Sequence, residues 1–572
     1  MKYLLNRERR SPNGGRGLAA WRPSSGPSVP RYRGGMSVNS YSPHPRSLGR
    51  RRPMRSITAI LALVSLSISG LALAAPPEEE IARQLAPIEL SLDEAIQQAL
   101  ENNLSIQVSR LERQSSTFAL SAARRVYTPN LALDTNLTES RSPAESQLDG
   151  ASQNENDNLN YNLRFEQQLP FGSSYSVRFN NNRLATNSQF FSFNPRYRST
   201  LNAQITQPLL RDFRADPQRR QIVISQNGER QAGHDFERSV LDVLRDVQNA
   251  YWDLVFAIRN HEVEVQSLDL ARDLLRNNQV QVEVGTMARM DVLQAQAEVA
   301  TREEALILAE EQIRQTEDVL KALIRDPEGP GFWDDELRPL DAPVVEDYEV
   351  DVDNAIRVAL QRRPELRSQR VQLDTNAYDV RFYRNQTLPR VDLVGLVQLT
   401  GVGGTRLVRQ GFFGPTVETI PGGYRDALSQ MSGFDYRDWQ VGLSFSYPIG
   451  PNEAHSQHAE AQTEVTRQRE EIRQQEVQIA QEVRTAVRQV QTNRRRIDAS
   501  RTARELQEVS LAAEQKKFEV GMTTSYFVVQ AQRDLAQARA NELQAIIDYN
   551  KAIVAVERAQ GTLAEHSRIT VR

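Results

Sequence analysis

The chain of 572 residues contains no cysteine, which excludes disulfide bonds, thiol nucleophiles and cysteine-ligated zinc. It also contains no G-x-G-x-x-G motif and no P-loop. No run of 18 apolar residues occurs in the body of the chain, which excludes a transmembrane helix there. We therefore expect neither an enzyme nor a cofactor, and we expect stability to come from packing or from assembly.

The N-terminal part differs from the rest in composition. Residues 1–53 are rich in Arg, Pro, Gly and Ser and would not form a core. A basic start followed by an apolar run over 57–73 indicates a secretory signal peptide cleaved near Ala74. The alternative is a buried or membrane-spanning helix. Met36 and Met54 are alternative translation starts to the first methionine.

Removal of this leader and signal peptide, residues 1–74, changes the charge of the chain. The segment holds 13 Lys+Arg and 1 Asp+Glu, which leaves 57 basic and 72 acidic residues and a formal charge of −15. Binding to a phosphate backbone needs a basic surface. We therefore expect no nucleic-acid partner.

The remaining sequence is duplicated. At an offset of 260 residues, "LDEAIQQALENN" from Leu92 aligns with "VDNAIRVALQRR" from Val352. At an offset of 236 residues, "EVGTMARMDVLQAQ" from Glu283 aligns with "EVGMTTSYFVVQAQ" from Glu519. Long registers without gaps indicate internal repeats.

We predict two repeats with the same order of elements: a short helix, strands, a long helix and a second short helix. The boundaries are 86–326 and 348–562 for the repeats, 327–347 for a linker and 563–572 for a C-terminal tail. The elements of the first repeat are predicted over 91–128, 130–209, 217–284 and 288–325, and those of the second over 352–388, 390–448, 453–520 and 524–560. Each long helix of 68 residues would measure about 100 Å.

Gly285 and Gly521 follow these long helices. Glycine is common just past the end of a helix, where the backbone turns left-handed, so each glycine is predicted to let the chain reverse direction. Physical reasoning alone favours a bare hairpin turn without a contact role.

The predicted strands alternate between apolar and polar residues, with four candidates in the first repeat and two in the second. Leu159, Leu163 and Phe165, for example, are separated by polar side chains. Strict alternation gives one apolar and one wet face, which in an exported protein fits a bilayer-spanning barrel with a polar lumen. Open strand edges are not tolerated in lipid, so several chains must close one barrel.

The duplicated segments, the strand exits "TQPLLRDF" (Thr206–Phe213) and "SYPIGPNE" (Ser446–Glu453), and the two Val-Gly turns together resemble the outer membrane efflux protein family, the TolC-like channels of Gram-negative bacteria. The resemblance covers residues 86–562. It implies an α+β membrane channel: a homotrimer with an outer-membrane β-barrel of four strands per protomer, continuous with a long periplasmic α-helical barrel.

The resemblance also implies a function. The chain would be the outer-membrane channel of a tripartite efflux or secretion system, surrounded by outer-membrane lipid and extending into the periplasm. It would give passive exit when docked to a periplasmic adaptor protein and an inner-membrane transporter. By position, the adaptor contacts are the turns Val284, Gly285, Thr286, Val520, Gly521 and Met522.

Two alternatives remain open. The channel could be a type I protein-secretion duct rather than a route for small molecules. In another class, the chain could be a non-conducting periplasmic coiled-coil protein, although this would not explain the strands.

The first repeat departs from the family pattern because it has four candidate strands. "QLPFGSSYSV" (Gln168–Val177) reads as a tight hairpin between two of them. The extra hairpin either joins the barrel, which would give a trimer 18 strands rather than 12, or extends above the membrane.

No metal site is expected. His455 and His458 stand three residues apart, but no third ligand is in view, so solvated side chains are favoured. His261 falls on the apolar seam of a long helix and is expected to be packed or hydrogen-bonded. The basic run over 493–501 is expected to form a solvated, salt-bridged helix face.

Overall fold

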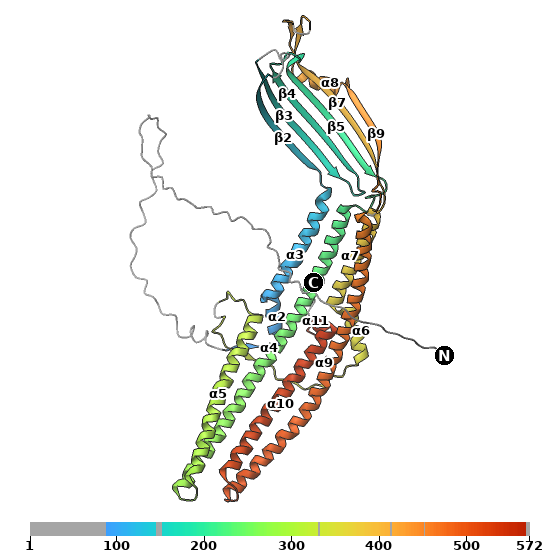
Figure 1. Cartoon of the computed structure of the whole chain (residues 1–572). Coiled ribbons are helices and arrows are strands. Elements are labelled where there is room, and N and C mark those ends of the chain that lie inside the picture. Colours follow the sequence, from blue (N-terminus) through green and yellow to red (C-terminus); the bar gives the residue numbers. More distant parts are fainter. Residues whose placement is uncertain (1–86, 145–151, 330–331, 412–413, 451, 568–572) are drawn as a thin grey trace, which may run out of the picture. The chain divides into compact units, whose positions relative to one another are not determined.

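The computed structural model describes residues 87–567, except 145–151, 330–331, 412–413 and 451 (Figure 1). The described residues belong to one unit, Pro76–Arg572. The predicted signal peptide lies outside them. Among the described residues, no helix combines the length and the apolar character needed to cross a membrane.

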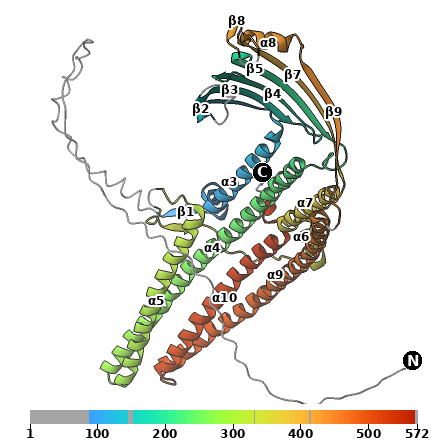
Figure 2. The same cartoon turned by 45° about the horizontal axis from the view of Figure 1, so that its top comes forward.

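Four long helices form the main helical layer: α4 (Pro217–Glu283), α5 (Arg289–Ile324), α9 (Glu453–Glu519) and α10 (Ser525–Gln560). α4 packs against α5 and α10, and α10 packs against α9, so two helical hairpins lie side by side (Figures 1 and 2). α4 and α9 have 67 residues each, about 100 Å of helix. Both begin at side-chain caps, where Asp216 accepts from the Arg219 N–H and Asn452 from the His455 N–H.

The short helices preceding the strands are each divided in two. The sequence predicts single helices over 91–128 and 352–388. The structure instead has α2 (Leu92–Asn102) and α3 (Leu104–Arg124) in the first repeat, and α6 (Val352–Arg362) and α7 (Pro364–Gln386) in the second. The physical reason is local: the Asn103 side chain caps α3 by accepting from the Ser105 and Ile106 N–H groups. Pro364 starts α7, because it has no N–H to continue the preceding helix.

The two breaks make equivalent contacts. Asn103 Nδ2 donates to the carbonyl of Leu323 at 2.9 Å, near the end of α5. A guanidinium nitrogen of Arg363 donates to the carbonyl of Ala559 at 3.4 Å, near the end of α10. The donors are 260 residues apart and the acceptors 236, which are the offsets of the duplicated segments. The duplication therefore preserves how each broken helix is tied to its hairpin.

The strands form one antiparallel seven-stranded sheet in the order β2-β3-β4-β5-β7-β8, with β9 pairing on β7. The bounds are β2 (Asn130–Pro143), β3 (Gln153–Gln168), β4 (Ser174–Thr186), β5 (Phe193–Pro208), β7 (Arg390–Arg409), β8 (Thr416–Ile420) and β9 (Arg437–Ser446). β5 of the first repeat pairs with β7 of the second, so both repeats contribute to one wall. The resemblance implied four strands per protomer in the barrel, and the sheet of this chain has seven.

Several short elements were not predicted from the sequence. A nine-residue helix, α8 (Tyr424–Ser432), interrupts the strand region predicted over 390–448. In the predicted linker, β6 (Leu337–Pro339) pairs in parallel with β1 (Ile88–Leu90). The tail begins with the short helix α11 (Leu563–His566).

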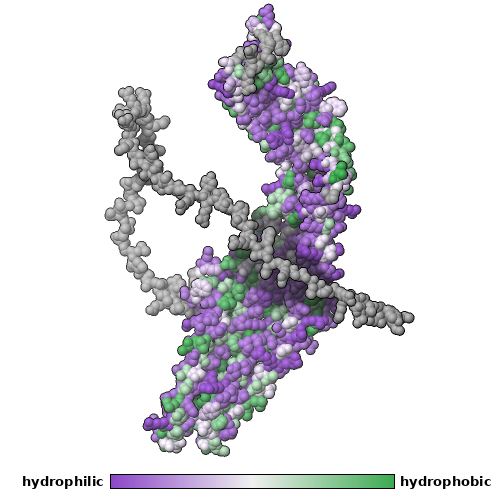
Figure 3. All heavy atoms as spheres, viewed as in Figure 1, coloured by the Kyte–Doolittle hydropathy of each residue, from purple (hydrophilic) through white to green (hydrophobic). Residues whose placement is uncertain are grey.

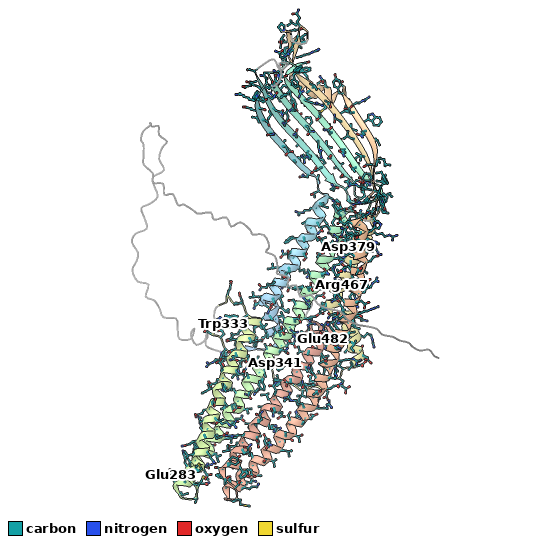
Figure 4. All side chains as sticks on the ribbon, in the orientation of Figure 1. Glu283, Trp333, Asp341, Asp379, Arg467 and Glu482 are labelled. Atoms are coloured by element: carbon teal, nitrogen blue, oxygen red, sulfur yellow. The ribbon has the colours of Figure 1, made fainter. Side chains whose placement is uncertain are left out.

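The strand β6 brings the linker against the helices. Tyr251 Oη of α4 donates to Asp341 Oδ2 at 2.7 Å, and the same carboxylate oxygen accepts from the Leu92 N–H at 2.7 Å (Figure 4). The linker therefore satisfies a free N–H group at the start of α2.

Candidate channel wall and helical tips

The sheet has one apolar face that runs across the strands. Residues directly opposite each other on neighbouring strands lie on the same face. Leu163 lies opposite Phe179, Phe179 opposite Leu201, and Leu201 opposite Leu399. One apolar row therefore crosses β3, β4, β5 and β7.

The other face is polar in the same register. Asn162 lies opposite Asn180, Asn180 opposite Thr200, and Thr200 opposite Thr400. Polar side chains of this face also bond one another: Asn182 Nδ2 donates to Asn160 Oδ1 at 2.9 Å, and Arg164 pairs with Asp134 at 3.3 Å. A polar face of this kind suits a water-filled lumen.

The apolar face is exposed at both edges of the sheet, on β9 and on β2. On β9, Trp439 is 75% exposed and Leu443 is 65% exposed; on β2, Leu133 is 70% exposed. Figure 3 shows hydrophobic side chains gathered over the β9 side of the sheet. β9 has 10 residues, which at a tilt of about 40° span about 25 Å, the height of the apolar band of an outer-membrane barrel.

Beyond Leu399, protein covers the same face of the sheet. α8 lies so close to β7 that a Cβ on Gly401 would stand 1.9 Å from the Ala427 carbonyl oxygen. Tyr424 reaches further across the sheet, donating to Asn181 Oδ1 of β4 at 3.0 Å. Its ring meets that of Tyr161 on β3 edge-on, with centroids 5.8 Å apart. α8 therefore spans β7, β5, β4 and β3 on the apolar side.

The ends of α4 and α9 away from the sheet form two turns, which we call the helical tips: residues 284–288 and 520–524. Gly285 has a φ of 82°, and the Thr286 N–H donates back to the Gln281 carbonyl at 2.9 Å. Gly521 has a φ of 75°, and the Met522 N–H donates to the Lys517 carbonyl at 2.8 Å. These are left-handed helix-terminating turns, so the prediction that each glycine ends its helix is confirmed.

The tips expose apolar side chains. Val284 is 68% exposed, Val520 is 69% exposed and Met522 is 79% exposed. Figure 4 labels Glu283, the last residue of α4, beside the first tip. Ser525 Oγ donates to Asp291 Oδ1 at 3.1 Å, so the starts of α10 and α5 are joined. The structure therefore brings the six predicted tip residues together in two adjacent turns.

A buried cluster of charged residues lies behind the tips and was not predicted from the sequence. Glu298 of α5 is only 2% exposed; it accepts from Arg302 at 2.9 Å and from Arg533 of α10 at 2.7 Å. The hydrogen bond to Glu298 raises the pKa of the Arg533 guanidinium above its ordinary value. The spacing of Glu298 and Arg302 suggests an ion pair, but only the fold places Arg533 beside them.

His455 and the basic run make local polar contacts, and His261 Nε2 of α4 lies 4.0 Å from Glu310 Oε1 of α5. His455 Nδ1 lies 2.8 Å from Asn452 Oδ1, at the start of α9. No group of three or more potential metal ligands occurs within the described ranges. In the basic run, Arg494 pairs with Asp498 at 3.0 Å and Arg496 with Asp548 at 2.6 Å, as expected of a salt-bridged face.

Comparison with known families decides the identity. The family described as outer membrane efflux protein matches residues 95–324 and 355–562, once for each repeat. The chain belongs to the outer membrane efflux protein family. This member is accordingly an outer-membrane channel for efflux that extends into the periplasm, and it is not an enzyme.

Solved structures of the same fold agree with this assignment. The CmeC outer membrane channel of Campylobacter jejuni is 15% identical, with 82% of this chain and 86% of that chain covered and a TM-score of 0.59. The outer membrane protein VceC of Vibrio cholerae is 16% identical, with 82% and 96% covered and a TM-score of 0.59. The MtrE outer membrane channel of Neisseria gonorrhoeae is 16% identical, with 82% and 89% covered and a TM-score of 0.54. No curated protein matches the chain by sequence.

Proposed function

We propose that the chain works as a homotrimer whose helical tips dock a periplasmic adaptor coupled to an inner-membrane transporter. Cargo would then leave passively through the polar lumen of the sheet. The observation that carries the proposal is the pair of tips, where two duplicated turns present exposed apolar side chains at the same end of the molecule. Exposed apolar patches commonly mark protein-binding surfaces. The contact residues would be Val284, Gly285, Thr286, Val520, Gly521 and Met522.

Assembly into a trimer is supported by the two sides of the helical layer. On one side, Phe118 of α3 is 63% exposed and Leu308 of α5 is 63% exposed. On the other side, Leu506 of α9 is 64% exposed and Val509 is 68% exposed. Apolar side chains on both sides favour packing of α9 of one copy against α3 and α5 of the next. A non-conducting coiled-coil protein is disfavoured for a separate reason: the apolar face of the sheet would then have no lipid to contact.

Photo-crosslinking in cells tests the docking. A photoreactive residue at Val284 or Met522 should form adducts with one periplasmic protein that is produced together with an inner-membrane transporter. Val344 is the matched control, since it is apolar and 57% exposed but lies in the linker. Absence of adducts at both tips, or identical adducts at Val344, would contradict adaptor docking. The class of the transporter produced with that adaptor would also distinguish small-molecule efflux from protein secretion.

Conductance tests the pore independently of any partner. The mature chain from Ala75, refolded into planar bilayers, should give discrete single-channel steps from a trimeric species. A helical, soluble protein that never enters the bilayer would refute the channel and return attention to the coiled-coil alternative.

A further inference from the structure

The hairpin of β3 and β4 lies inside the sheet, between β2 and β5. β2 pairs with β3 along its full length, from Asn130 opposite Glu166 to Pro143 opposite Gln153. β4 pairs with β5 from Ser174 opposite Thr206 to Leu184 opposite Arg196. Both flanks of the hairpin are therefore bonded to neighbouring strands, as in a continuous wall and unlike a loop that projects above it.

The hairpin also continues both faces of the wall. Its apolar side carries Leu163 and Phe179, in line with Leu201 of β5 and Leu399 of β7. Its polar side carries amides such as Asn162, in line with the polar face of the neighbouring strands. A hairpin above the membrane would not need an apolar face in register with the lipid-facing band.

The helix α8 fixes the hairpin in this position. Its Tyr424 contacts Tyr161 on β3 and Asn181 on β4, while α8 itself lies on β7. Asn181 is 2% exposed, so the contact is buried. Through α8, the second repeat thus contacts the hairpin of the first repeat and keeps it within the sheet.

The six long strands of each copy form an open sheet, which must pair with other copies to close into a barrel. Of the seven strands, only β8 is short, and it pairs with the far half of β7. Among the strands described, β2 and β9 each have a partner on one side only. In lipid such open edges must be paired. β2 and β9 each expose apolar residues, such as Leu133 and Leu443, as expected of edges at the level of the bilayer.

We infer that three copies of this chain, joined β9 to β2, close a barrel of 18 strands, since each contributes six of the seven strands in its sheet. The inference rests on the proposed homotrimer and extends it to the width of the exit. With strands about 4.8 Å apart and tilted by about 40°, 18 strands give a backbone diameter of about 36 Å, and 12 strands about 24 Å. The outer-membrane exit is therefore wide and amide-lined, and it suits bulky hydrated cargo.

Cysteine crosslinking counts the copies in the ring, because the chain has no cysteine of its own. The test pairs Leu133→Cys on β2 with Leu443→Cys on β9. Two further pairs, with Val441→Cys or Phe445→Cys in place of Leu443→Cys, sample the register. Oxidation should give a denaturant-resistant ladder that ends at three chains. A ladder ending at two would mean a 12-stranded ring of two copies, and no ladder in any register would mean that β9 and β2 do not meet. Either result overturns the inference. Leu163→Cys with Phe179→Cys, which lie opposite each other on one hairpin, is the control and should give monomers only.

Polymer exclusion measures the width. A variant lacking 152–187 would remove the hairpin of β3 and β4, so that β5 follows β2 along the chain, and these two strands run in opposite directions and can pair. The diameter of the largest polyethylene glycol that enters from the extracellular side should fall to about two-thirds of the full-length value, in proportion to strand number. An unchanged cut-off in a conducting deletion variant would overturn the inference. Failure of the full-length chain to conduct would refute the proposed channel instead, whatever the crosslinking shows.

Discussion

At the scale of single residues, four glycines of the long helices and their tips differ in backbone conformation. Gly285 and Gly521 have φ angles of 82° and 75°, which side chains of L-residues rarely adopt. Gly228 and Gly233 lie inside α4, where the backbone is helical. A Cβ added at any of the four would meet nothing within 4 Å, so steric clashes do not distinguish them. Backbone conformation alone should decide what a substitution does.

Alanine substitutions should therefore have opposite effects at the two kinds of site. Gly285→Ala and Gly521→Ala should each lower the free energy of unfolding by about 1–2 kcal/mol, the cost of a left-handed alanine. Gly228→Ala and Gly233→Ala should each raise it by up to about 1 kcal/mol, because alanine favours helix over glycine. Thermal unfolding followed by the helical circular dichroism signal measures both. Equal effects at all four positions would refute an origin in backbone strain.

A second residue-scale feature is the largely buried carboxylate of Glu365, whose side chain is 14% exposed. It pairs with Arg363 at 3.0 Å and with Arg558 at 2.9 Å, where α7 meets α10. Burial alone would raise the pKa of Glu365, but the two guanidinium groups outweigh burial and leave the pKa below its ordinary value. The carboxylate form is therefore more stable in the folded than in the unfolded chain.

A lowered pKa in the folded state gives stability above the unfolded pKa, about 4.5, that is lost as the pH falls through the folded value. Glu365→Gln should cost about 1.5–3 kcal/mol at pH 7 and should flatten the decline of the melting temperature below about pH 5. Glu464→Gln is the control, since Glu464 pairs with Arg467 on an exposed helix face and should change stability by less than about 1 kcal/mol. A wild-type pH profile for Glu365→Gln would refute this role.

At the scale of elements, the sequence predicts the long helices and the strand region well, because their signals are local. Caps such as Asp216, the tip glycines and strict alternation each act over a few residues. The breaks at Asn103 and Arg363 also have local causes, but helical periodicity continues across them and conceals them. β1 and β6 could not be predicted, because they pair across roughly 250 residues. α8 is short and is placed by its contact with Gly401, which only the folded sheet supplies.

α8 should be the element most sensitive to glycine replacement in the sheet. An alanine Cβ at Gly401 would stand 1.9 Å from the Ala427 carbonyl oxygen, and at Gly403 it would stand 2.3 Å from the Gly423 carbonyl oxygen. Both obstacles are backbone atoms, so Gly401→Ala and Gly403→Ala should displace α8.

Limited trypsin digestion should then cut after Arg425, within α8, at least about tenfold faster than in the wild type, since displaced segments lose protection. Gly442→Ala on β9 is the control, because its nearest neighbouring atom would be a side-chain nitrogen at 3.9 Å. Unchanged cleavage in Gly401→Ala would mean that α8 does not depend on this close contact.

At the scale of the whole molecule, the sequence predicts a multichain barrel but not its strand number. Alternation shows that the hairpin of β3 and β4 has two faces, yet a projecting rim can alternate as well. Only the pairing of both flanks, with β2 and with β5, places it in the wall. The tip residues were carried over by position from the family resemblance, and the fold adds that the two tips are adjacent.

The sides of the helical layer give the last prediction. Leu308 and Val509 are 63% and 68% exposed in the single chain, and their helices α5 and α9 are the outer helices of the layer. Leu308→Lys or Val509→Lys would place a charge in each interface between copies, and burying an unpaired charge is costly. Each variant should lower the temperature at which detergent-solubilised trimers dissociate, by at least about 10 °C, while the helical signal of the monomer stays unchanged. Gln537→Lys is the control, because Gln537 is exposed on α10, which packs between α4 and α9 instead of at either side of the layer. If Leu308→Lys and Val509→Lys both dissociate at the wild-type temperature, as the control should, the copies meet through other surfaces, and the trimer would lose its support from the helices.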